Sequence, residues 1–388
     1  MICIKQKGFI MKLVIDKNEL AAAIQIVVRA VPSKTTMPIL ECILIDASSD
    51  QIKLIANDME LGIETVVKGT IEERGIVAID AGIFSNLVRK LPDSDVHITT
   101  NVDHVSIVCE NARFNILGRD GSDFAYLPEI ERREGITLSQ LSLRDMITKT
   151  IFSISSNESN KMMTGELLEI HGDTLRVVAL DGHRISIRKI ELPEVYPDRK
   201  VIIPGKTLNE INKILTGSAD KQVQIYFTDK HVLFEIDQSL VVSRLIEGEY
   251  FRIDQMLSTD YETRIRINRQ EFLNCIDRAT LLVKEDDKKP IILMIRDENM
   301  ELRINTTLGS MNEVIEIEKS GSDLNIGFNP KFLIDALRAI SDEEVTIYLL
   351  SQKAPCFIRN DVEEKREDSS EKQEYCYLIL PVNFISID

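Results

Sequence analysis

The stretch that decides how this sequence folds covers residues 178–187 and reads V-A-L-D-G-H-R-I-S-I. Apolar residues alternate before and after a polar D-G-H-R group at 181–184, and such alternation is typical of β-strands. Gly182 allows backbone angles that other residues resist, so the group indicates a tight connection between two strands. Taken alone, it is most simply interpreted as an ordinary hairpin turn with a solvated Arg184.

The chain around this motif repeats three times. Three short strands each lead into a helix that opens with a polar capping residue and an acid three positions later, a known helix-start signature. The capping positions are Asp16, Ser142 and Asn268, which lie 126 residues apart in both steps. The helices that follow are predicted over 16–31, 142–154 and 268–284. Such equal spacing predicts one structural unit written three times.

A second helix recurs in phase with the first. Its apolar pattern starts at Phe84, Leu208 or Phe332, at equal steps of 124 residues. These second helices are predicted over 82–91, 205–215 and 330–340, and paired apolar strands precede them, such as 44–45 with 52–55 and 167–170 with 175–179. Two helices with seven or eight short strands form an α+β domain of about 125 residues. We therefore expect three tandem domains at 11–135, 136–261 and 262–388.

Composition excludes several classes of protein. The chain has 388 residues, of which 44% are apolar, as in globular proteins. It has no apolar run long enough to span a bilayer and no signal peptide at its start, so we expect a cytoplasmic protein. Met11 begins a stretch with the pattern of a natural start, so residues 1–10 are expected to be an extension, either from an upstream start or added for expression. Six scattered cysteines without a C-x-x-C pair indicate reduced structural thiols.

Charge is unevenly distributed along the sequence. The net charge of −16 argues, for the chain as a whole, against nucleic-acid binding. The six predicted helices, however, contain 13 Lys and Arg against 7 Asp and Glu, a net +6 that leaves −22 for the remainder. A general preference of helices for Lys and Arg is one explanation. The other is a basic helical face inside an acidic shell, suited to a polyanion.

No catalytic or metal-binding motif is present. The G-K-T at 205–207 resembles the end of a phosphate-binding loop, but the required earlier glycine would fall at Lys200, so these residues more simply open a helix. The five histidines have no metal-ligand spacing. His183 beside Asp181 could form an acid–base pair, but no nucleophile motif accompanies it. We therefore expect no cofactor, no metal and no enzymatic activity.

Three short motifs are shared with a known family. They are T-M-P-I-L at 36–40, V-A-L-D-G-H-R-I at 178–185 and L-I-L-P-V at 378–382. Together with the three repeats, they make the chain resemble the bacterial DNA sliding clamp, the beta subunit of the DNA polymerase III holoenzyme, over residues 11–388. The resemblance implies a head-to-tail homodimeric ring that slides on double-stranded DNA, tethers the replicative polymerase and is opened by a separate ATP-dependent clamp loader.

The resemblance also assigns roles to individual residues. Partner proteins would insert a short peptide motif into an apolar pocket formed by Met163, Leu180, Gly182, His183, Arg184, Ile185, Phe251, Met256, Pro355, Leu380, Pro381 and Val382. Arg184 would meet a polar or acidic group of the peptide. Three positions depart from the family pattern: Leu180 replaces Thr, Phe251 replaces Pro and Gln255 replaces an Arg found in some members.

Two further surfaces are implied. Lys34 would face the DNA, and the basic residues of the second helices, Arg89, Lys90, Lys213 and Arg338, would join it. The subunit contact would pair Phe114 and Ile116 with Leu281 and Leu282, although all four could instead be ordinary core residues. The charged stretch at 361–374 is predicted to be a mobile solvated loop, and residues 383–388 extend past the usual end of the family.

One alternative remains from the sequence. An acidic cytosolic enzyme or scaffold built from a triplicated domain would share the repeats and never meet DNA. In such a protein the basic residues should not be confined to one helical face.

Overall fold

The computed structural model describes residues 11–101, 103–133, 135–283, 289–359 and 373–384. It divides into two compact units: residues up to Leu141 together with Lys213–Leu245, and Ser142–Asn212 together with the residues from Ile246 onward. Each unit combines α-helices with antiparallel sheets, so the α+β prediction is confirmed. The predicted extensions at 1–10 and 385–388, and positions 361–372 of the charged stretch, lie outside the described residues.

The first unit contains a 13-stranded sheet in the order β10-β13-β14-β15-β4-β3-β2-β6-β9-β8-β7-β1-β5. Its strands are β1 (Lys12–Asp16), β2 (Cys42–Asp46), β3 (Ile52–Asn57), β4 (Leu61–Val67), β5 (Thr70–Glu73), β6 (Ile76–Asp80), β7 (Asp95–Asn101), β8 (His104–Cys109), β9 (Ala112–Asp120), β10 (Ile136–Ser139), β13 (Gln222–Phe227), β14 (His231–Ile236) and β15 (Ser239–Arg244).

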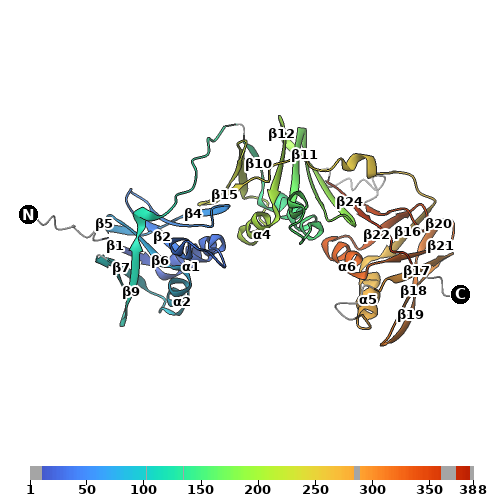
Figure 1. The fold of residues 1–388 in the computed structure, drawn as a ribbon, viewed down its shortest axis with the longest axis horizontal. Coiled ribbons are helices and arrows are strands. Elements are labelled where there is room, and N and C mark those ends of the chain that lie inside the picture. The colour runs from blue at the N-terminus through green and yellow to red at the C-terminus, as the bar shows by residue number, and fades with distance from the viewer. Residues whose placement is uncertain (1–10, 102, 134, 284–288, 360–372, 385–388) are drawn as a thin grey trace, which may run out of the picture. The chain divides into compact units, whose positions relative to one another are not determined.

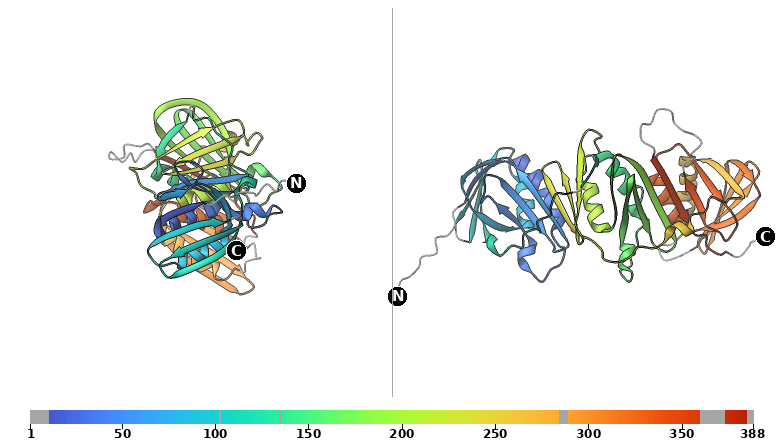
Figure 2. Two further views of the ribbon diagram at one scale, coloured as in Figure 1. Left: turned by 90° about the vertical axis from the view of Figure 1, so that its left-hand side faces the viewer. Right: turned by 90° about the horizontal axis from the view of Figure 1, so that it is seen from above.

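Two helices pack on the strands of the first unit. Helix α1 (Lys17–Val27) lies beside α2 (Ala81–Lys90), as Figure 1 shows, and packs against β3 and β4; Figure 2 shows the same blue region from two further sides. The predicted cap Asp16 accepts hydrogen bonds from the backbone N–H groups of Asn18 and Glu19 at 2.9 and 3.1 Å. The apolar residues of α1, including Leu20 and Ile24, recur at helical spacing and form its buried face.

The second unit has a seven-stranded sheet, ordered β11-β12-β24-β23-β22-β16-β20, and a four-stranded sheet, ordered β19-β18-β17-β21. The strands are β11 (Gly165–Leu180), β12 (Arg184–Pro204), β16 (Thr263–Asn268), β17 (Ile291–Arg296), β18 (Asn299–Thr306), β19 (Gly309–Glu316), β20 (Glu318–Gly321), β21 (Leu324–Phe328), β22 (Glu344–Leu349), β23 (Cys356–Arg359) and β24 (Gln373–Ile379). Gln373 and Glu374 therefore belong to a strand and not to the predicted loop.

The remaining helices are α3 (Gln140–Thr148), α4 (Gly205–Ile214), α5 (Arg269–Thr280) and α6 (Pro330–Ala339). Asn268 caps α5 as predicted, accepting from the backbone N–H of Glu271 at 3.0 Å. The prediction for Ser142 is wrong, because α3 begins at Gln140 and contains it. In the other two repeats the capping residue is the last residue of a strand, and the equivalent residue before α3 is Ser139.

The D-G-H-R group connects β11 to β12 as a tight hairpin. The backbone N–H of Asp181 donates to the carbonyl of Arg184 at 3.3 Å, and Gly182 has a φ of 89°, where a side chain would be strained. The hairpin prediction is thus confirmed, but the solvated arginine is not, because Arg184 is only 6% exposed. The predicted pairing of 167–170 with 175–179 is wrong, because both segments belong to the single strand β11 and pair with β12; Gly172 between them has a φ of 60°.

Several narrower expectations can be compared with the described residues. Helix α4 opens at Gly205, so G-K-T starts a helix as predicted. Cys42, Cys109, Cys275, Cys356 and Cys376 are free thiols. Within the described ranges, no group of three or more His, Cys, Asp or Glu side chains could hold a metal ion, and no helix is long and apolar enough to cross a membrane.

Candidate functional site

An apolar row crosses five neighbouring strands of the second unit. Leu180 on β11 pairs with Ile185 on β12, which pairs with Leu378 on β24; Phe357 on β23 and Tyr348 on β22 continue the row. All five side chains are at most 7% exposed and belong to one hydrophobic cluster. The row brings together residues that lie up to 198 positions apart in the chain.

Two short segments cover this row. The first, at 250–257, contains the 3₁₀ turn Ile253–Met256, and the Tyr250 hydroxyl donates to the carbonyl of Val178 at 3.3 Å. The second is the 3₁₀ turn Lys161–Thr164, which brings Met162 and Met163 against the cluster. Four predicted pocket residues therefore pack in one cluster: Met163, Leu180, Ile185 and Phe251.

The other predicted pocket residues lie at the edge of this cluster or beyond it. Met256 is 53% exposed, Leu380 is 38% exposed, and Pro355, Pro381 and Val382 are half-buried. The backbone N–H of Leu380 donates to the carbonyl of His183 at 2.9 Å, which holds the segment after β24 against the hairpin. Val382 donates to the carbonyl of Gly327 on β21 at 2.8 Å, so this segment continues toward the four-stranded sheet.

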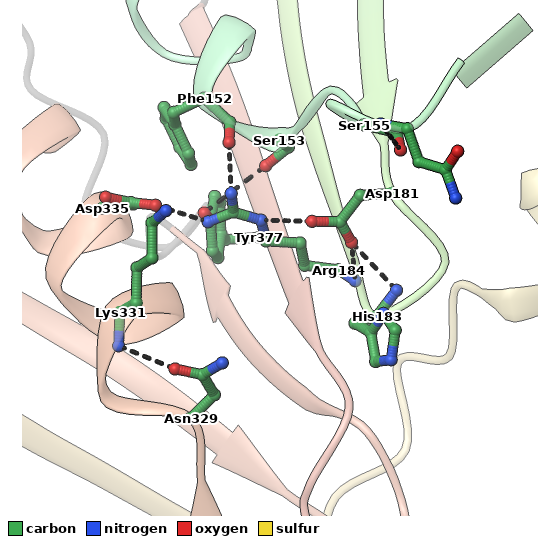
Figure 3. A network of polar contacts seen from close by, with 11 residues as sticks. Phe152, Ser153, Ser155, Asp181, His183, Arg184, Asn329, Lys331, Asp335 and Tyr377 are labelled. Carbon is green, nitrogen blue, oxygen red and sulfur yellow. Dashed lines mark hydrogen bonds and ion pairs between the residues drawn. The ribbon is translucent and has the colours of Figure 1, made fainter. Parts of the chain in front are cut away.

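Arg184 is the centre of a polar network (Figure 3). Its Nε donates to Asp181 Oδ2 at 2.9 Å, its Nη1 donates to Asp335 Oδ2 at 2.7 Å, and its Nη2 donates to the carbonyl of Phe152. The guanidinium also lies over the Phe332 ring, 4.6 Å from its centroid. Arg184 is buried and already bound to two carboxylates of its own chain, and its contact with a group of a bound peptide stays a prediction.

The surroundings of Arg184 keep it charged. Burial opposes its charge, but Tyr377, Asp335 and Asp181 outweigh this effect and raise the pKa of the guanidinium. Burial likewise raises the pKa of the Tyr377 hydroxyl, which lies 3.4 Å from the Ser153 hydroxyl. The network therefore contains a neutral tyrosine and a charged arginine.

Two residues of the site were missed by sequence reasoning. Asp335 and Phe332 both come from α6, and the Phe332 ring lies 6.1 Å from the ring of His183. In the sequence, Phe332 only marked the start of a recurring helix and had no predicted role in the site; in the structure it is half-buried. Nothing local in the sequence links it to a motif 149 positions earlier.

The predicted DNA-facing residues are exposed in each unit. Lys34, Arg89, Lys90 and Lys213 all have exposed side chains. Arg338 is also exposed, but it forms an ion pair with Asp277 of α5 at 3.2 Å. Its charge is therefore partly neutralised by a neighbouring helix.

The residues predicted to form a subunit contact lie near two free strand edges. Residues 112–117 of β9 pair only with β8 within the described chain, because pairing with β6 starts at Gly118. Strand β19 ends the order of its sheet. Phe114 is 41% exposed and Leu281 is 79% exposed, which excludes a core role for both, while Ile116 and Leu282 are half-buried.

Comparison with known proteins identifies one family along the whole chain. Models of the N-terminal, central and C-terminal domains of the DNA polymerase III beta subunit match residues 11–128, 137–251 and 254–371. The beta sliding clamp of Staphylococcus aureus is 31% identical over 383 residues, covering 96% of this chain and 99% of the relative. That of Staphylococcus epidermidis is 32% identical over 365 residues, covering 91% and 94%.

Solved structures give the same result. A putative DNA polymerase III beta subunit from Eubacterium rectale is 61% identical, with a TM-score of 0.91 and coverage of 96% of this chain and 99% of that one. The DNA polymerase sliding clamp of Bacillus subtilis is 32% identical, with a TM-score of 0.90 and coverage of 97% and 100%. These matches do not support the alternative of an enzyme or scaffold that never meets DNA.

Proposed function

The chain belongs to the DNA polymerase III beta-subunit family, the beta sliding clamps, and we propose that it is a DNA polymerase processivity factor whose two copies close into a ring around duplex DNA. The ring performs no chemistry. Contacts of Lys and Arg with the DNA backbone carry no sequence information, which is what sliding requires. A polymerase held on the ring rebinds at high effective concentration instead of diffusing away.

The observation that carries the ring is a strand seam that occurs twice inside one chain. In the first unit β4 pairs with β15, with Leu61 opposite Ser243 and Thr65 opposite Ser239. In the second unit β12 pairs with β24, with Arg184 opposite Ile379 and Arg188 opposite Tyr375. Leu61 and Arg184 are equivalent, because each closes its hairpin by accepting from the backbone N–H of an aspartate three positions earlier.

The two free edges are the unpaired counterparts of these seams. Gly309 closes the β18–β19 hairpin opposite Thr306, as Leu61 and Arg184 close theirs. Ile116 pairs with Val105 on β8, as Ser243 pairs with Val232 on β14. Continuing the same register places Gly309 opposite Ile116 of a second copy and Ser310 opposite Asn115. Since Gly309 lies beside Leu282, the half-buried Ile116 would meet the apolar side chains near it.

This register supports a head-to-tail homodimer. Each closed seam removes a pair of open strand edges, which are otherwise sites of aggregation. The seams also support the division into three domains at 11–135, 136–261 and 262–388, since in each seam the last strand of one repeat pairs with an internal strand of the repeat before it. The remaining proposed contacts follow from the family: DNA would face Lys34, Arg89, Lys90, Lys213 and Arg338, in the bacterial cytoplasm where DNA is replicated.

The apolar row and its covering segments provide the proposed partner site. Methionines and aliphatic side chains form adaptable surfaces for short peptides with apolar anchors. Met163, Phe251, Met256 and Leu380 would contact such a peptide from the replicative polymerase, the clamp loader or other partners. Gly182, His183, Pro355, Pro381 and Val382 would form the edge of the pocket, and buried Leu180 and Ile185 its base.

A cysteine pair at the proposed seam tests the ring. The variant Asn115→Cys with Ser310→Cys should form a disulfide between two copies under mild oxidation, because directly opposed residues lie close enough for a disulfide. Light scattering should give twice the chain mass of 44.1 kDa at low micromolar concentration.

In the matched control the second cysteine lies two residues further along β19, so Asn115→Cys is combined with Asn312→Cys. Each single-cysteine variant controls for disulfides formed by the native thiols. Efficient cross-linking of the shifted pair alone would disprove the register. A monomer of the parent protein at that concentration would overturn the ring itself.

A further inference from the structure

We propose that Asp335 is a positioning residue of the partner-peptide pocket, which acts through Arg184 to hold the Phe332 ring beside the D-G-H-R hairpin. The proposal rests on the proposed function of that pocket. It assigns to helix α6 a role that no motif in the sequence indicated.

The first step is the position of Arg184 between two elements. Asp181 Oδ1 accepts from the backbone N–H groups of His183 and Arg184 at 2.9 and 3.1 Å, and its Oδ2 accepts from Arg184 Nε (Figure 3). The opposite side of the guanidinium binds Asp335 on α6. One side chain thus ties the hairpin to the helix through charge-assisted hydrogen bonds, which are stronger than neutral ones.

The second step is the ring that this ion pair supports. Phe332 and Asp335 are three positions apart on α6 and therefore share a face of the helix. The Arg184 guanidinium packs on the Phe332 ring at 4.6 Å from its centroid, and the exposed ring of His183 lies 6.1 Å from that of Phe332. The carboxylate of Asp335 consequently fixes both the helix and the aromatic wall next to His183.

The third step concerns charge. Arg184 is 6% exposed, so its positive charge depends on the two carboxylates that contact it. Two carboxylates face one guanidinium, and Lys331, one turn before Asp335 on α6, adds a second positive charge to the residues of Figure 3. The Asp335 carboxylate should therefore disfavour peptides with an acid next to their anchors, relative to a chain that lacks its charge. Removal of the Asp335 charge should weaken binding of an apolar peptide and, at the same time, reduce this discrimination.

The experiment uses the full-length protein and two synthetic peptides. Both carry one leucine and one phenylalanine anchor and are capped at their ends, and one has a glutamate next to the anchors in place of glutamine. Fluorescence anisotropy measures their affinities for the parent, Asp335→Asn, Asp335→Glu and a control, Asp323→Asn. Asp323 forms exposed ion pairs with Lys319 and Arg296 in the same unit, so this control removes an equal charge elsewhere.

The expected result separates positioning from simple structural loss. Asp335→Asn should bind the neutral peptide about tenfold more weakly, the effect of one charge-assisted hydrogen bond, and Asp335→Glu should restore most of the affinity. The preference for the neutral over the acidic peptide should shrink only in Asp335→Asn. The Asp323→Asn control should match the parent in both measurements.

Two outcomes overturn the proposal. Equal affinity and equal discrimination in the parent and Asp335→Asn would show that Asp335 has no role in the pocket. Should that variant not fold, Phe332→Leu keeps the ion pair and removes the ring, and parental binding by it would exclude the aromatic wall. A parent protein that binds neither peptide would instead disprove the proposed pocket, whatever the variants do.

Discussion

In the turn at residues 58–61 of the first unit, Asp58 Oδ1 accepts from the backbone N–H groups of Glu60 and Leu61 at 2.9 and 2.7 Å. In the turn at 181–184 of the second unit, Asp181 Oδ1 accepts from the equivalent groups at 2.9 and 3.1 Å. The residue after each aspartate has a positive φ, 74° for Met59 and 89° for Gly182. The two repeats therefore share one turn geometry.

The side chains that this turn presents are different. Leu61 is an ordinary core residue at 1% exposure, and the next residue, Gly62, lies against the side chain of Leu127, which would have to move to admit a larger residue there. Arg184 occupies the place of Leu61 in the second repeat and reaches Asp335 on α6. A repeated backbone thus presents a buried aliphatic residue in one copy and a buried charge in the other, and only the second copy can organise a polar network.

The largest difference between the two turns should appear when their aspartates are removed. Asp181→Ala takes a carboxylate from a buried arginine as well as the turn hydrogen bonds, and we expect a loss of about 3–5 kcal/mol in the free energy of unfolding. Asp58→Ala removes the hydrogen bonds of a turn that presents Leu61 and leaves no buried arginine unpaired, at a cost of about 1 kcal/mol. Urea denaturation of the full chain measures both, and equal losses would contradict the distinction drawn between the turns.

A second difference lies in the neighbouring strands. Glu166 and Ile43 occupy equivalent places in their repeats. Glu166 pairs with Ile203 and Ile43 pairs with Ile79, and each of these partners lies one residue before the end of the strand that leads into the second helix. Glu166 is 1% exposed, and burial raises the pKa of its carboxyl well above the usual range, against a smaller opposing effect of the Thr150 hydroxyl. The carboxyl is therefore protonated in the folded chain at pH values where it ionises in the unfolded chain.

This arrangement predicts the sign of a pH dependence. The contribution of Glu166 to stability is fully present below its unfolded pKa of about 4.3, and falls by about 1.4 kcal/mol per pH unit until the folded pKa is reached. Glu166→Gln should remove this fall, so the variant gains stability over the parent as the pH rises from 5 to 7. Thermal unfolding across that range is the measurement, and parallel curves for the two proteins would show that Glu166 does not titrate as expected.

The smallest difference concerns the positive φ itself. Gly182→Ala places a side chain in a left-handed conformation and should destabilise the protein by about 1 kcal/mol. Met59→Gly relieves the same strain in the first repeat and should be stabilising by about 0.5 kcal/mol, since the greater freedom of glycine in the unfolded chain offsets part of the gain. Chemical denaturation should give changes of opposite sign, and two changes of the same sign would show that the turns are not equivalent.

The local elements of this fold were largely predictable because their causes are local. Asp16 and Asn268 cap helices through hydrogen bonds to residues two or three positions away, so their pattern is visible in the sequence. Ser142 misled the prediction because β10 pairs with β13 as far as Ser139, and the helix follows directly. The end of a strand is set by its partner, which for Ser139 is Gln222, and no short window contains both residues.

The sequence by itself determined the caps of α1 and α5 and the D-G-H-R hairpin, because each depends on residues within a few positions of one another. It also determined the threefold repeat, because similar local patterns recur along the chain. Only the tertiary structure decided that Arg184 is buried against Asp335, that the apolar row spans five strands and that residues 112–117 of β9 and strand β19 form sheet edges within the described chain. The ion pair and the row join residues more than a hundred positions apart, and an edge is defined by the strand order of a whole sheet, so the packing of the whole unit settles all three.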